Sequence, residues 1–161
     1  MLILRGDKER AIQVSEEGLE QARTRGDRIG AYSALYNLAQ VAISRNEYEL
    51  ATRMLEEGVS LSEEMRDRAN LAHFLEGLAV VAGMQERVEV SARLFGAAEG
   101  LLEEVGDRLY NYYTPDRSLY ERTLDGLRSV LGESAFEGAM AAGRAMTFDE
   151  AAAFALDEAP Q

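Results

Sequence analysis

The chain has 161 residues, of which 17 are Lys or Arg and 29 are Asp or Glu, so its formal net charge is −12. A chain this acidic gains no counterion-release affinity for nucleic acid and is repelled by anionic membranes, so neither is expected as a partner. It has no Cys, which excludes disulfides, thiol nucleophiles and thiolate metal sites. The longest uncharged run, 29–44, is too short and too polar to span a bilayer, and a cytoplasmic location is expected.

Hydrophobic residues recur at spacings of three and four, only two prolines occur, and no alternating β-branched run is present, so the chain is predicted to be all-α. Gly-Asp or a related polar pair interrupts this spacing at regular intervals. We therefore predict helix breaks near residues 6, 27, 46, 67, 86 and 107.

The chain begins with a short apolar stretch before the first break. Met1 to Leu4 is interpreted as the end of a first helix whose earlier turns are missing, followed by a helix from about Asp7 to Arg25. Without its neighbour, that helix would expose an apolar stripe, and a second copy of the chain is the simplest cover. The residues predicted to mediate this homodimer are Leu2, Ile3, Leu4, Ile12 and Leu19.

An internal repeat spans the next two segments. Residues 28–67 and 68–107 align without a gap and share 12 identical residues of 40, among them Leu35/Leu75, Leu38/Leu78, Ala39/Ala79 and Ala42/Ala82. A fixed period of this kind indicates stacked two-helix units, which cannot bury their apolar faces alone. A generic helical bundle would explain the spacing but not the identities in register.

The repeated residues resemble the tetratricopeptide (TPR) pattern, in which small residues lie at close helix crossings and a large residue fills the gap between them. The matching positions are Asn37-Leu38-Ala39, Ala42, Tyr48, Ala51, Leu55 and Gly58, and in the next unit Leu75, Leu78-Ala79, Ala82, Ser91, Phe95 and Ala98. The resemblance implies a TPR-like array of period 40 over residues 1–107, with a truncated first repeat.

The last third departs from this period. Thr114-Pro115 is predicted to cap a helix that runs to about Leu131 and stops at Gly132. A second helix is predicted from Glu133 to about Ala145. Thr147 to Glu150 forms a capping-box sequence that opens a third helix, from Asp149 to about Asp157. Residues 108–161 are thus predicted to form a helical cap on the array.

The same region carries a second resemblance. The strings Ala92-Arg-Leu-Phe-Gly-Ala-Ala-Glu99, Tyr120-Glu-Arg122, Leu131-Gly-Glu133 and Gly143-Arg-Ala145 resemble the TPR-containing C-terminal region of bacterial multidomain transcriptional regulators of the signalling-ATPase or LuxR type. This resemblance implies a non-catalytic interaction or ligand-sensing arm. A free-standing TPR adaptor that binds a peptide or helix is the alternative.

The sequence offers little for catalysis. It has one His and lacks phosphate-binding glycine loops and nucleophile-elbow motifs, so no catalytic, metal-binding or cofactor-binding residue is predicted, and the chain is not expected to be an enzyme. His73 and Glu76 lie three residues apart on one helical face and are interpreted as a solvated pair.

Two surfaces are candidates for binding. In TPR arrays partners bind the concave face formed by the first helix of each unit, which here corresponds to Tyr36, Gln40, Ile43, His73, Glu76, Val80 and Met84. This face would suit a protein or peptide partner or serve stability alone. A tyrosine cluster near Arg108 and Arg117 would either seal the joint between array and cap or stack on a ligand; its members are Tyr110, Tyr112, Tyr113 and Tyr120.

Overall fold

The computed structural model describes residues 5–106 and 116–157, and within these ranges the regular structure is entirely α-helical, without a strand. The all-α prediction is therefore confirmed for the described part of the chain. The helices are α1 (Arg5–Arg25), α2 (Arg28–Ser44), α3 (Tyr48–Met65), α4 (Arg68–Met84), α5 (Val88–Val105), α6 (Arg117–Leu131), α7 (Glu133–Arg144) and α8 (Phe148–Asp157).

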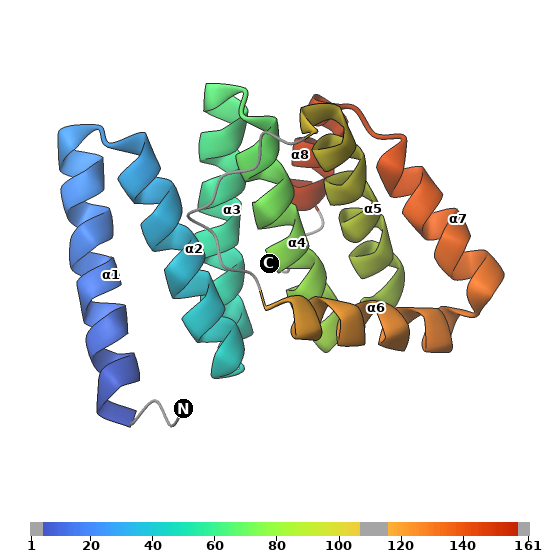
Figure 1. Cartoon of the computed structure of the whole chain (residues 1–161), viewed down its shortest axis with the longest axis horizontal. Helices are drawn as coiled ribbons and strands as arrows, with labels where there is room; N and C mark the ends of the chain where they lie inside the picture. Colours follow the sequence, from blue (N-terminus) through green and yellow to red (C-terminus); the bar gives the residue numbers. More distant parts are fainter. Residues whose placement is uncertain (1–4, 107–115, 158–161) are drawn as a thin grey trace.

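Helices α1 to α5 stand side by side in chain order, each packed on the next (Figure 1). Helix α7 continues this row, because it packs along α5. Helix α6 departs from the row and crosses one end of α4 and α5 (Figure 1). Helix α8 packs against α3, α4 and α5, so the C-terminal helices close the row on more than one side.

The turns of the row explain why polar pairs interrupt the sequence at regular intervals. A residue with positive φ follows each of the first five helices, at Gly26, Asn46, Arg66, Glu86 and Gly106. In the first four turns the next amide donates to a carbonyl five residues earlier, at 2.8–3.0 Å, which is the Schellman arrangement of helix ends. The breaks predicted near residues 27, 46, 67 and 86 are confirmed, while residue 107 lies outside the described residues.

Two helix starts differ from those predicted. Helix α1 begins at Arg5, so Gly6 and Asp7 lie within its first turn and not in a break. The first turn tolerates Gly because its N–H groups need no intrahelical acceptor. The N-cap of helix α6 is Asp116, whose carboxylate accepts a hydrogen bond from the Leu119 amide at 3.0 Å, while the predicted cap residues Thr114 and Pro115 lie outside the described residues.

The capping box at the last helix is present as predicted. The Thr147 amide donates to the Glu150 carboxylate at 2.8 Å, and the Glu150 amide donates to the Thr147 hydroxyl at 3.3 Å. The next residue, Phe148, is buried, and the guanidinium of Arg66 lies 4.4 Å from the centre of its ring. The start of α8 is therefore fixed against the turn between α3 and α4.

The two helix pairs in the middle of the row have matching dimensions. Helices α2 and α4 each contain 17 residues and begin at Arg28 and Arg68, while α3 and α5 each contain 18 residues. Asp27 and Asp67 cap the two first helices, each accepting from the amide three residues on, at 2.9 and 3.0 Å. The same local hydrogen bonds thus form twice, 40 residues apart.

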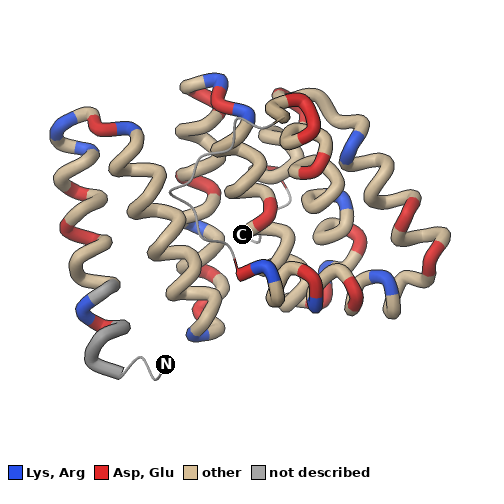
Figure 2. The backbone as a smooth tube through the Cα atoms, in the orientation of Figure 1, with Lys and Arg blue, Asp and Glu red and all other residues tan. Residues whose placement is uncertain are grey.

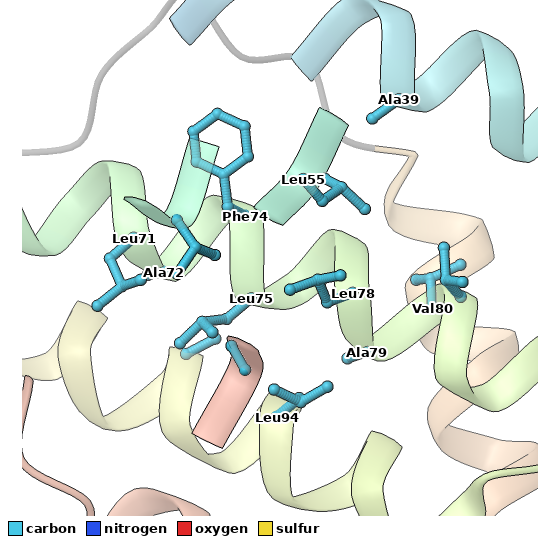
Figure 3. Packing of buried hydrophobic residues seen from close by; sticks show 14 of the residues in the cluster. Ala39, Leu55, Leu71, Ala72, Phe74, Leu75, Leu78, Ala79, Val80 and Leu94 are labelled. Atoms are coloured by element: carbon cyan, nitrogen blue, oxygen red, sulfur yellow. The ribbon is translucent and has the colours of Figure 1, made fainter. Parts of the chain in front are cut away.

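Helix α4 is the centre of the core. Every residue from Ala69 to Ala82 is buried, and α4 contacts α2, α3, α5, α6 and α8. Leu55 of α3 and Leu94 of α5 reach the central helix from two sides, and the small side chain of Ala79 lies where α5 approaches (Figure 3). The Ser91 hydroxyl donates to the Ala79 carbonyl at 2.6 Å, which shows how closely α4 and α5 lie at this point.

Glycines bring several other helices into contact. A β-carbon on Gly58 would overlap the ring of Phe74, and one on Gly96 would overlap the Met140 carbonyl. On the facing helix, a β-carbon on Gly143 would overlap the Arg93 carbonyl. The α5 and α7 backbones therefore meet directly, and any larger side chain at these two positions must push them apart.

Within the described ranges, no helix combines the length and the apolar character needed to cross a membrane.

Replacing Ala79 by Leu should lower the free energy of unfolding by about 1–3 kcal/mol, because the site is fully buried at the α4–α5 crossing and the larger side chain overpacks it. Ala39→Leu, at the matching position of α2, should behave in the same way. Urea denaturation measures the effect. Ala141→Leu, on the exposed face of α7, is the control, and equal midpoints for Ala79→Leu and this control would contradict the packing argument.

Gly96→Ala and Gly138→Ala should change stability in opposite directions. The first places a methyl group against the Met140 backbone and should destabilise by about 1–3 kcal/mol. The second adds a methyl group where no atom lies within 4 Å and should stabilise α7 by roughly 0.4–1 kcal/mol. Thermal unfolding of both variants checks this, and a shift of the same sign in both would contradict the direct α5–α7 contact.

Candidate functional site

The predicted concave face lies on α2 and α4 but is not an open groove. Five of its seven residues are buried: Tyr36, Ile43, His73, Glu76 and Val80. The other two, Gln40 and Met84, are half-buried. These residues therefore form no open groove over their length, although Glu76 and Met84 each line a hollow beside α6. The reason is the crossing of α6, whose Thr123 methyl lies 2.9 Å from the point that a β-carbon on Gly83 would occupy.

A pair of tyrosines joins α2 to α6. The hydroxyls of Tyr36 and Tyr120 lie 3.3 Å apart, and these two residues expose 1% and 4% of their surface. The ring of Tyr36 meets Phe74 edge-on with 6.3 Å between centroids, and Tyr120 meets Phe95 in the same way at 5.9 Å. The pair therefore belongs to an aromatic contact chain that links α2, α4, α5 and α6.

Both phenols are held in the neutral form. Burial raises the pKa of Tyr36, because the phenolate would lose its hydration, and the nearby carboxylate of Glu76 raises it further. Burial, followed by repulsion from Tyr36 and Glu76, raises the pKa of Tyr120 well above its usual range. A phenol held in this way contributes to packing and cannot easily serve as a base.

His73 and Glu76 form a buried pair, so their interpretation as a solvated pair is wrong. The two residues expose 4% and 7% of their surface, and His73 Nδ1 lies 3.4 Å from Glu76 Oε2. Arg117 of α6 reaches the other carboxylate oxygen at 3.8 Å. The burial arises because α4 is enclosed on all sides.

The remaining chemistry of the site is limited in the described ranges. They contain no group of three or more His, Asp or Glu side chains arranged to hold a metal ion. Of the predicted tyrosine cluster, Tyr120 lies in the joint with α2, whereas Tyr110, Tyr112, Tyr113 and Arg108 lie outside the described residues.

The predicted self-association surface is only partly described. Leu2, Ile3 and Leu4 lie outside the described residues. Ile12 is half-buried and packs against the core, and Leu19 is buried with 4% of its surface exposed. Leu19 is therefore not part of an exposed stripe, because α2 covers that face of α1.

A groove lies between α5, α6 and α7, and Glu76 of α4 is the one predicted binding residue that lines it. It consists of two hollows of about 450 and 500 Å³ that share Glu99, Leu124 and Met140. Volumes of this size are typical of sites that bind small molecules or partner side chains. We name it the α5–α6–α7 groove. No register or motif signals it, because it exists only where α6 leaves the row and spans the gap between α5 and α7.

Another hollow, separate from the groove and of about 440 Å³, lies where α6 crosses the turn between α4 and α5. Its lining is mostly apolar and includes Met84, Val88, Leu127 and Val130. Val130 is the most exposed large hydrophobic side chain of the described residues, with 70% of its surface exposed. The α5–α6–α7 groove and this hollow thus both depend on the position of α6.

Comparison with protein families, with curated proteins and with solved structures returned no match for this chain.

The tyrosine pair should make stability fall at alkaline pH. Because both pKa values are raised in the folded state, the unfolded chain releases these protons first, from about pH 10, and folding then loses free energy as the pH rises. Urea unfolding between pH 8 and 11 should show this decline. Replacing both Tyr36 and Tyr120 by Phe should make it shallower, and an unchanged pH profile in the double variant would contradict the assignment.

Proposed function

We propose that this chain is a non-catalytic interaction or ligand-sensing arm of a bacterial regulator of the signalling-ATPase type. In this proposal residues 1–107 form TPR-like repeats of period 40, and residues 108–161 form the helical cap. The arm works in the cytoplasm and transmits a signal by packing against another protein. It binds neither nucleic acid nor membrane, in line with its net charge of −12.

The observation that carries the proposal is the duplication of local detail in the pairs α2–α3 and α4–α5. Besides equal lengths and caps, each pair has an ion pair between the start of its first helix and the end of its second. These are Arg28–Glu64 at 2.7 Å and Arg68–Glu104 at 2.8 Å. A repeated unit that packs only on its neighbours is typical of arrays that present surfaces to partners.

The burial of polar side chains on α2, α4 and α6 also supports an interaction role. His73, the one imidazole of the chain, is buried next to Glu76, and Tyr36 and Tyr120 are held neutral in the core. These imidazole and phenol groups contribute to the packing of the core. The hollows formed by α6 supply the concave surface that a partner or ligand would use.

The regulator arm and the free-standing adaptor differ in what they contact. The proposal expects an in-frame coding sequence for a nucleotide-binding ATPase module upstream of Met1. It also expects that the purified module and this chain bind each other, with a dissociation constant in the micromolar range by titration calorimetry. An adaptor would have its own start and bind no such module.

A metal titration tests the non-catalytic part of the proposal. We expect no stoichiometric tight uptake of Zn²⁺, Mn²⁺ or Ni²⁺ by calorimetry, because the single His is buried beside one carboxylate. His73→Gln is the matched variant. Tight uptake by the native chain that this variant abolishes would contradict an interaction-only function.

A further inference from the structure

The α5–α6–α7 groove has an apolar floor. Phe95 of α5 and Phe136 and Met140 of α7 are buried beneath it, whereas Leu102 and Leu124 are only half-buried. The two leucines therefore leave apolar surface facing the groove that no described side chain covers completely. Such surface is stabilised when an apolar partner group removes it from water.

The rim of the groove has more carboxylates than the chain itself neutralises. Six acidic residues line it, and three arginines each lie near one of them. These pairs are Arg144–Glu99 at 2.7 Å, Arg128–Glu137 at 3.7 Å and Arg117–Glu76 at 3.8 Å. The other three acids are Glu103, Glu121 and Asp125, and no ion pair within 4 Å joins them to another described residue, although Arg144 interacts with Glu103 at longer range. Of these acids only Glu76 lies on α4, and the others lie on α5, α6 and α7, where Figure 2 shows charged segments along the backbone, whereas α2 is almost uncharged.

A buried carboxylate points to a cationic occupant. Glu76 lines the groove, its side chain is only 9% exposed, and its two carboxylate oxygens have only distant partners, His73 Nδ1 at 3.4 Å and Arg117 at 3.8 Å. A buried carboxylate with only distant partners is incompletely neutralised, and positive charge placed in the groove beside it would stabilise it. The groove thus combines an apolar floor with the acids Glu103, Glu121 and Asp125 and the buried carboxylate of Glu76. An occupant with apolar groups and positive charge would complement these features.

We propose that the α5–α6–α7 groove binds a basic amphipathic helix of a partner protein. The apolar side chains of that helix lie on the floor at spacings of three and four residues, and its Lys or Arg side chains lie next to Glu103, Glu121 and Asp125. A helix suits the site better than a small cation, because two neighbouring hollows of ligand size share Glu99, Leu124 and Met140 and have acids along both. The inference rests on the proposed interaction function and names the class of partner.

A labelled model peptide tests the inference on the full chain. The probe is a fluorescein-labelled amphipathic helix of about 14 Leu and Lys residues, with Leu at helical spacing. Fluorescence anisotropy at physiological salt should show saturable binding. The triple variant Glu103→Gln, Glu121→Gln, Asp125→Asn should weaken it about tenfold, because three favourable charge contacts are lost.

A matched variant separates the groove from the general acidity of the chain. Glu9→Gln, Glu16→Gln and Glu49→Gln change the net charge by the same amount at exposed positions of α1 and α3, and none of these residues lines the groove. This variant should weaken binding less than about twofold, since screening limits charges at long range. Circular dichroism and the urea midpoint should show that both triple variants fold like the native chain.

Four outcomes would overturn the inference: no binding of the amphipathic peptide, equal loss in both triple variants, equal binding of a scrambled peptide of the same composition, or full displacement by spermine at matched charge. The last two would indicate a site for charge alone. None of these results bears on the binding of the ATPase module, which uses a different ligand. The two proposals can therefore fail independently.

Discussion

The enclosure of α4 on every side is the constraint on which the rest of the structure depends. A helix that exposes no face must pack small residues where its neighbours cross it and must pair each polar group that it carries. Ala79 meets the first requirement. Glu76 meets the second only in part, because its two oxygens have only distant partners, His73 at 3.4 Å and Arg117 at 3.8 Å. The central helix therefore links the core to the groove.

The position of α6 decides what surface the protein offers. Had this helix continued the row, α2 and α4 would share an open face like that of a repeat array. By crossing α4 instead, it places Tyr120 against Tyr36 and closes that face. The same crossing leaves space between α5, α6 and α7, where Leu124 of α6 faces Met140 of α7. One helix thus removes one candidate site and forms another.

Direct backbone contact between α5 and α7 holds the groove in shape. Gly96 and Gly143 allow the two helices to meet without intervening side chains, so the wall formed by α5 and α7 is rigid. The ion pair between Arg144 of α7 and Glu99 of α5 lies at an exposed position on the rim and adds little stability. Close packing fixes the walls of the groove, whereas the charges on its rim govern what binds there.

The sequence by itself determined the helices and most of their ends, because left-handed turn residues, aspartate caps and the Thr147–Glu150 capping box act over three to five residues. It also indicated the repeat, since residues 28–67 and 68–107 share 12 identical residues of 40. Only the tertiary structure decided that His73 is buried and where the groove lies. Both depend on α6, whose contact with α2 joins residues 84 positions apart, and no local pattern encodes the direction in which a helix crosses its neighbours.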